Sequence, residues 1–211
     1  MAVDTTFFDL LRLSRSSFYL NEPIETNRLG NGEMFTASLG AALWRGEFTG
    51  FPLRHSASAE IEARITVLQR PGEFFTVYDR RSCGPQLDPS GAMLSGSSPK
   101  IQSLNADNKR IKLEDLPSGY EIRPGDYIGW DYGSSPQRKA LHRVVAGGVA
   151  DVNGLSPLLE VTPHIRAGVA IETPVSLIRP KIKARLLSAT YGRGAGGITE
   201  GVRISFTQTL R

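Results

Sequence analysis

A dense series of short β-prone segments between residues 101 and 171 constrains this chain more than any other feature. There are six of them: IQSL, RIKLEDL, YEIRPGDYIGW, KALHRVVAG, LLEVTP and AGVAIET. Turn-forming groups separate them, among them Pro117-Ser118-Gly119, Pro124-Gly125-Asp126 and Asn153-Gly154. Short strands at such close intervals, divided by Gly and Pro turns, are typical of small antiparallel barrels and sandwiches. We therefore predict a small antiparallel β-barrel, OB-like or similar, over residues 99–174.

The flanking sequence predicts a second unit, a β-sandwich packed by one α-helix. The helix is expected at residues 56–70, because Ala57, Ile61, Ile65 and Leu68 recur at helical spacing. Strands are predicted at MFTASL, ALWRGEFTGFPL, EFFTVYD, VSLIRPKIKARLL and VRISFTQTL. The last two alternate apolar and polar residues, as strands with one buried face do. The predicted fold class is mostly β.

Three stretches are predicted to be loops. NEPIETNRLGNGEMF has turn chemistry, SATYGRGAGGITEG is Gly-rich and expected to be mobile, and SCGPQLDPSGAMLSGSSPK is a long connection before Pro99. The last of these, with the turn Glu172-Thr173-Pro174, marks the predicted domain borders. Residues 1–98 and 175–211 would form one domain, into which residues 99–174 are inserted. Two consecutive domains split near residue 98 are the alternative.

Composition and motifs argue against several classes of protein. No apolar run approaches the roughly 20 residues of a membrane helix, and Asp4 and Asp9 interrupt the N-terminal apolar stretch, so we expect no membrane insertion and no signal peptide. The single cysteine, Cys83, cannot form an internal disulfide. GxSxG, HExxH, CxxC and P-loop motifs are absent. We therefore expect a non-enzymatic protein without catalytic residues, cofactor or metal.

Positive charge gathers near the C-terminus. The net charge is +4, and residues 175–211 hold seven basic residues against one acid, Glu200. Such a stretch indicates either a face for nucleic acid or an acidic partner, or else a solvated strand edge. Because Trp and Arg are enriched at binding hot spots, the candidate protein-interface residues are Trp44, Arg45, Arg179, Lys181, Lys183 and Arg185. A core position is the alternative for Trp44 and for Trp130.

A family resemblance follows from residues 28–81. RLGNGEMFTASLGAALWRGEFTGFPLRHSASAEIEARITVLQRPGEFFTVYDRR, followed by GYEIRPGDYIGWDYG and KALHRVV, resembles distal tail proteins of long-tailed, siphovirus-like bacteriophages and of gene-transfer-agent-like particles. The resemblance implies a ring, usually six-fold, that joins the tail tube protein to the hub at the tail tip or baseplate. It also implies a place at the distal end of the virion tail, assembly in the host cytoplasm and passing contact with DNA in the channel.

Three other functions compete with the ring protein. The barrel could be a carbohydrate-binding module for host attachment, in which Tyr127, Trp130 or Tyr132 stacks on a sugar. The chain could be another tail component, such as a hub or an adaptor. A tail-associated hydrolase using His142 is the weakest alternative, because His142 lies in an apolar strand, where a structural histidine is the default.

Overall fold

The computed structural model describes residues 3–211, which form two compact units. Unit 1 comprises residues 3–75 and Ala184–Thr209, and unit 2 comprises Thr76–Lys183 with Leu210–Arg211. Strands account for 43% of the chain and helices for 9%, so the prediction of a mostly-β fold is confirmed. Neither helix in residues 3–211 has the length and apolar character needed to cross a membrane.

The borders of unit 2 lie outside the predicted ones at residues 98/99 and 174/175. The reason is that the long loop before Pro99 is bonded to the strands that follow it. Gln86 donates its backbone N–H to Asp126 Oδ1 at 2.9 Å and its side-chain amide to the Pro124 carbonyl at 2.8 Å. Arg179 similarly donates its backbone N–H to the Cys83 carbonyl at 2.7 Å. Both flanking segments therefore belong to unit 2.

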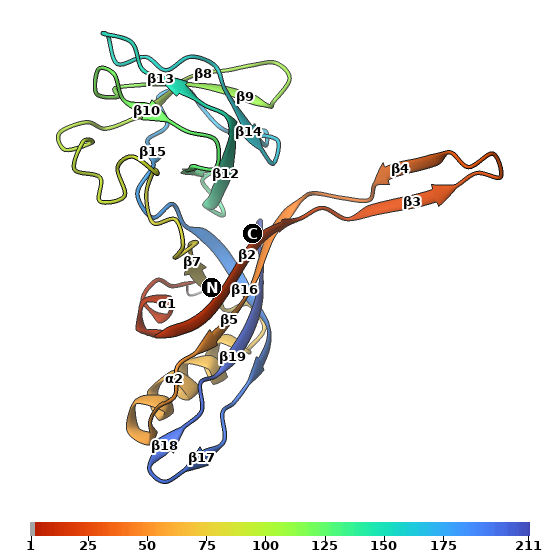
Figure 1. The fold of residues 1–211 in the computed structure, drawn as a ribbon, viewed down its shortest axis with the longest axis vertical. Helices are drawn as coiled ribbons and strands as arrows, with labels where there is room; N and C mark the ends of the chain where they lie inside the picture. Colours follow the sequence, from red (N-terminus) through yellow and green to blue (C-terminus); the bar gives the residue numbers. More distant parts are fainter. Residues whose placement is uncertain (1–2) are drawn as a thin grey trace. The chain divides into compact units, whose positions relative to one another are not determined.

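Unit 1 is built on a six-stranded sheet with the order β1-β7-β16-β19-β5-β2 (Figure 1). Its strands are β1 (Val3–Asp4), β2 (Leu13–Asn21), β5 (Leu43–Gly50), β7 (Phe74–Val77), β16 (Ile182–Thr190) and β19 (Arg203–Gln208). The four strands from β16 to β2 pair antiparallel. Along β5, Trp44, Gly46 and Phe48 face the core, and Arg45 and Glu47 take the opposite face.

Two helices cover the inner face of this sheet. In α1 (Phe7–Leu10), Phe7 meets Phe75 edge-on at 5.5 Å between ring centroids, and Phe8 lies 4.9 Å from Phe48. The main helix, α2 (His55–Leu68), begins one residue before the predicted start and buries Ile61, Ile65 and Leu68. The spacing of these three residues is the feature that predicted it. Each fully buried side chain of this size stabilises the fold by about 1.5–3 kcal/mol.

The Gly-rich segment near the C-terminus is structured, which corrects its prediction as a mobile loop. Strand β16 runs on to Thr190, and β17 (Gly194–Ala195) and β18 (Ile198–Thr199) form a hairpin that pairs with β6 (Leu53–Arg54). The two residues of its turn, Gly196 and Gly197, both have positive φ, at 58° and 84°. Such a turn matches the twist of the flanking strands, so glycine here specifies a hairpin.

Unit 2 is a small antiparallel barrel, as predicted. Its sheet has the order β15-β11-β12-β14-β9-β8. The strands are β8 (Lys100–Leu104), β9 (Arg110–Glu114), β11 (Tyr127–Tyr132), β12 (Arg138–Ala146), β14 (Leu159–Thr162) and β15 (Val175–Ser176), with a separate pair β10 (Glu121–Ile122) and β13 (Gly148–Val149). Backbone hydrogen bonds between Ile101 and residues 172–173, and from Val175 to Pro99, bring the two edges together. The sheet is therefore nearly closed around its core.

Candidate functional site

The region of unit 1 that stands out as a candidate site is a long β-hairpin, residues 22–42, here called the arm. Its strands are β3 (Ile24–Arg28) and β4 (Met34–Ser38), paired from Ile24↔Ser38 to Arg28↔Met34. Its tip is closed by hydrogen bonds from Leu29 N–H to the Glu33 carbonyl, 2.9 Å, and from Gly32 N–H to the Leu29 carbonyl, 3.0 Å. The arm continues β2 and β5 and projects away from the sheet of unit 1 (Figure 1).

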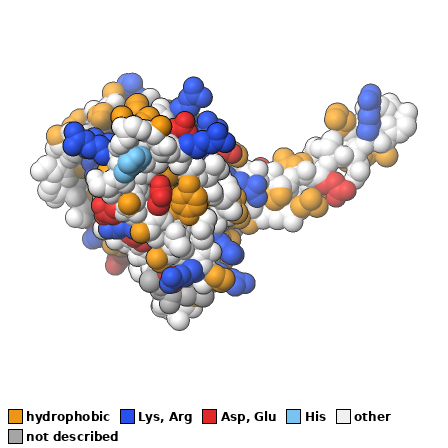
Figure 2. Space-filling view, turned by 90° about the horizontal axis from the view of Figure 1, so that it is seen from below, with side chains coloured by type: hydrophobic (Ala, Val, Ile, Leu, Met, Phe, Trp, Pro, Cys, Tyr) orange, Lys and Arg blue, Asp and Glu red, His pale blue; other side chains and the backbone are white. Residues whose placement is uncertain are grey.

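All ten strand residues of the arm are exposed to solvent. Its large apolar side chains are exposed by 45–67%: Ile24, Leu29, Met34, Phe35 and Leu39. Figure 2 shows apolar side chains along the arm, interspersed with charged ones. An isolated two-stranded hairpin is marginally stable in water, and gathered apolar side chains on a surface mark sites of protein contact. The arm therefore has the properties of an element that binds another protein.

The charges of the arm are predominantly acidic. It carries Glu22, Glu25 and Glu33 against the single base Arg28. Glu25 accepts a hydrogen bond from Asn27 at 3.5 Å, and Glu33 accepts one from Asn31 at 3.3 Å. None of the three carboxylates forms an ion pair with another residue within 3–211. A partner surface for the arm should thus be basic.

The sequence does not predict the arm, because its pattern assigns residues 21–35 to turns. That prediction is correct for Leu29–Gly32, but residues 24–28 form strand β3. A signal was present in the sequence: β-prone stretches, IETNR and MFTAS, lie on both sides of LGNG, the pattern of a hairpin. Pro23 and Asn27 weakened this signal, because both residue types are typical of turns. The arm also has no buried face, so its sequence shows no clear alternation of apolar and polar residues.

The predicted protein-interface residues do not form one surface. Trp44 is 0% exposed and stacks on Phe18 at 5.2 Å, so it is a core residue and offers no contact to another protein. Arg45 and Arg185 lie in unit 1, whereas Arg179, Lys181 and the buried Lys183 lie in unit 2. Arg179 and Lys181 lie 6.0 and 5.8 Å from the ring of Tyr78. Arg45 and Arg185 share one face of the sheet that bears the arm, because both pair with Thr207.

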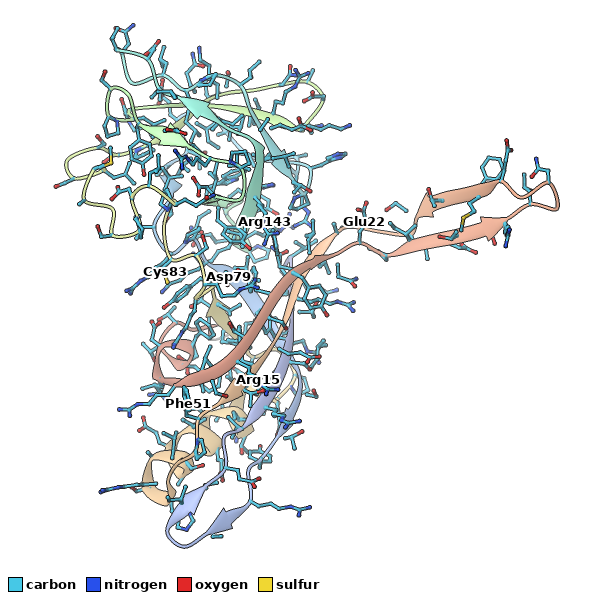
Figure 3. The ribbon with its side chains drawn as sticks, in the orientation of Figure 1. Arg15, Glu22, Phe51, Asp79, Cys83 and Arg143 are labelled. Carbon is cyan, nitrogen blue, oxygen red and sulfur yellow. The ribbon has the colours of Figure 1, made fainter. Side chains whose placement is uncertain are left out.

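The predicted sugar-stacking residues, Tyr127, Trp130 and Tyr132, are buried to within 4–6% exposure. Trp130 stacks on His142 at 4.5 Å between ring centroids. Tyr127 donates its hydroxyl to the buried Asp79 at 3.1 Å and accepts a hydrogen bond from Arg143, a network whose outer members are labelled in Figure 3. These rings pack inside unit 2 and are largely buried, so they expose little ring surface on which a sugar could stack.

An open groove of about 840 Å³ does lie in unit 2, lined in part by Asp131, Lys139, Ser176, Arg179 and Lys181. Lys139 Nζ lies 2.8 Å from Asp131 Oδ1, so the acid on its floor is already paired with a base. The lining also includes apolar side chains, those of Pro99, Trp130, Val175 and Ile178. Trp130 is 4% exposed, so only a small part of its ring faces the groove.

His142, the histidine of the hydrolase alternative, has a structural role in unit 2. It is 3% exposed, and its Nδ1 lies 2.7 Å from the Pro163 carbonyl oxygen. Burial lowers its pKa to about 4, so the ring is neutral at pH 7 and Nδ1–H donates to that carbonyl. Within residues 3–211, no three His, Cys, Asp or Glu side chains are grouped as metal ligands.

The comparisons with known proteins add no family to this description. No family model matches the chain, and no curated protein is similar to it in sequence. The candidate site therefore rests on the arm and on the sheet from which it extends.

Proposed function

We propose that this chain is a structural, non-enzymatic subunit of a long-tailed bacteriophage or a gene-transfer-agent-like particle, a distal tail protein that forms a ring between tail tube and tip hub. The observation that carries the proposal is the arm. It holds ten exposed strand residues and unpaired carboxylates on an element too thin to stabilise itself. Such an element is useful to a protein that assembles.

Closure of a ring requires a subunit whose two contact surfaces differ from each other. Each subunit contacts its neighbour through two different surfaces, one that projects and one that receives, and the rotation between copies closes the ring. The arm supplies a projecting surface, and the helix-backed sheet of unit 1 supplies a rigid base for it. The proposed partners are copies of the same chain, usually six, with the tube protein on one side and the hub on the other.

The decisive experiment is an electron cryomicroscopy map of the intact particle. We expect density for this chain as one ring of copies where the tube ends and the tip begins. A single copy on the tail axis, or copies outside the tube, would instead identify a hub or an adaptor and overturn the proposal.

A variant without the arm tests the same proposal on the purified chain. Replacement of residues 24–38 by an Asn-Gly turn should leave unit 1 folded and should abolish incorporation into particles. A matched control, Val152→Ser with Ile171→Ser, removes two apolar side chains that are 85% and 64% exposed in unit 2, and should incorporate normally. Equal incorporation of the armless chain contradicts a role of the arm in assembly.

A further inference from the structure

The outer face of the sheet in unit 1 carries four arginines in two rows, and we call it the arginine face. Arg15 on β2 and Arg203 on β19 both pair with Thr49, and so flank it in one row. Arg45 on β5 and Arg185 on β16 both pair with Thr207 and flank it in the other. Strands are about 4.8 Å apart, so the two arginines of each row have backbones about 10 Å apart. Arg15 is labelled in Figure 3.

A track of small residues separates the two rows of arginines. Ser17 and Ser205 pair with Glu47 from either side, and Ser188 pairs with Ser205. Glu47 is the one acid in this track. The face is thus shallow, open and positive, with arginines on both sides of a single carboxylate.

The guanidinium groups of the arginine face have no acidic partner in the described part of the chain. Within residues 3–211, none of the four forms an ion pair or a side-chain hydrogen bond. Two neighbouring polar atoms on this face, Arg45 Nε and Thr207 Oγ1, are buried without a hydrogen-bond partner among the described residues. These two atoms are out of reach of an incoming group, but Arg15, Arg185 and Arg203 are exposed, so their guanidinium groups can bind an anionic group.

We infer that the arginine face receives the arm of a second copy of this chain. The charges are opposite in sign, because the arm has Glu22, Glu25 and Glu33 against Arg28, whereas the face has four arginines against Glu47. The sizes agree as well: nine residues from Glu22 to the tip span about 30 Å, and the eight residues of β5 span about 27 Å. This inference rests on the proposed self-assembly and adds its interface.

The arm cannot reach the arginine face of its own chain. It continues β2 and β5 beyond the pair Asn21↔Leu43 and leads away from the face (Figures 1 and 3). The contact is therefore between copies, and it is head-to-tail, since arm and face are different surfaces. An open row of copies leaves one arm and one arginine face without a partner at its two ends. Closure of the row into a ring would pair them.

Apolar contacts complete the fit between arm and face. The face exposes Tyr19, which pairs with Arg45, and Leu187 at the bulge of β16, at 46% and 56%. Arginine planes and stems also cover aromatic and aliphatic side chains well, so Phe35, which lies on the same side of the arm as Glu25, has partners on the face. Since ion pairs contribute most of the attraction between arm and face, self-association should weaken as the salt concentration rises.

Charge reversal tests the inference on the whole purified chain. The arm variant is Glu25→Lys with Glu33→Lys, and the face variant is Arg45→Glu with Arg203→Glu. Sedimentation velocity at low salt should show that each variant alone self-associates at least ~10-fold more weakly than the wild type. Mixing the two should restore association, because the reversed arm of one then meets the reversed face of the other.

A matched control reverses charge away from both surfaces. Lys109→Glu with Arg138→Glu changes two exposed bases of unit 2 by the same net charge and should associate like the wild type. Circular dichroism of every variant monitors folding. A mixture that stays monomeric while both variants are folded overturns the inference, as does a wild type that remains monomeric at millimolar concentration and low salt.

Two further outcomes separate this interface from the proposed function. If the arm and face variants still form the tail ring in particles, the ring stands and the arm-to-face contact falls. If the face variant binds duplex DNA more weakly than the wild type while its self-association is unchanged, the arginine face binds nucleic acid and the inference is overturned. The position of the chain in the particle map tests the ring independently of both.

Discussion

The barrel of unit 2 and the arm of unit 1 are both antiparallel β structure, yet the barrel buries its apolar side chains and the arm exposes them. The barrel closes on itself and buries Ile101, Ile111, Leu113 and Leu159 completely. In the arm, both faces and both edges meet solvent, and its apolar side chains remain exposed. The difference teaches that the barrel encloses its apolar side chains, whereas the arm leaves them open to contact with another surface.

The largest expected effect comes from breaking the barrel core. Trp130→Ala removes a ring that stacks on His142 and should destabilise the protein by about 3–5 kcal/mol, as large-to-small core changes do. Urea unfolding followed by far-ultraviolet circular dichroism measures the loss. Exposed Leu158→Ala in the same unit serves as the control, with an expected change within about 0.5 kcal/mol.

Acid should also weaken the barrel, through His142. Its pKa falls from 6.5 to about 4 in the folded chain, so between these values the unfolded chain binds a proton that the folded chain does not. Stability from this group is complete above pH 6.5 and declines as the pH falls towards 4, by up to roughly 3 kcal/mol.

Unfolding free energies from pH 7 to pH 4 check this dependence. In His142→Asn the decline should be shallower than in the wild type. The matched change at exposed His164, His164→Asn, should show the same decline in unfolding free energy as the wild type. Equal slopes for wild type and His142→Asn would show that other groups govern the acid response.

The smallest effect on stability is expected in the arm. Phe35→Ser with Met34→Ser should alter the free energy of unfolding by no more than about 0.5 kcal/mol, because both side chains are exposed. Self-association of the same variant should nevertheless weaken markedly. A clear loss of monomer stability would mean that the arm packs on its own chain, and would remove the contrast with the barrel.

Sequence reasoning succeeded where burial imposes a pattern. Ile61, Ile65 and Leu68 predicted the main helix because one face of it is buried, and Gly and Pro turns predicted the barrel. The arm lacks a buried face, so no alternation revealed β3. Trp44 was ambiguous because sequence does not distinguish a core tryptophan from a surface one, and the stack on Phe18 decides it. Unit borders depend on long-range bonds such as that from Gln86 to Asp126.

The continuity of the arm with β2 and β5 has a mechanical consequence. The ladder between these two strands runs from Leu13↔Gly50 to Asn21↔Leu43, and β5 pairs with β19 on its other side. Antiparallel hydrogen bonds lie perpendicular to the strands, so a pull along the arm, which draws β2 and β5 together, loads the bonds between β5 and β19 at once in shear. The same bonds would break in succession if the strands were peeled from an edge. An arm rooted in this way can transmit tension to the sheet without tearing free of it.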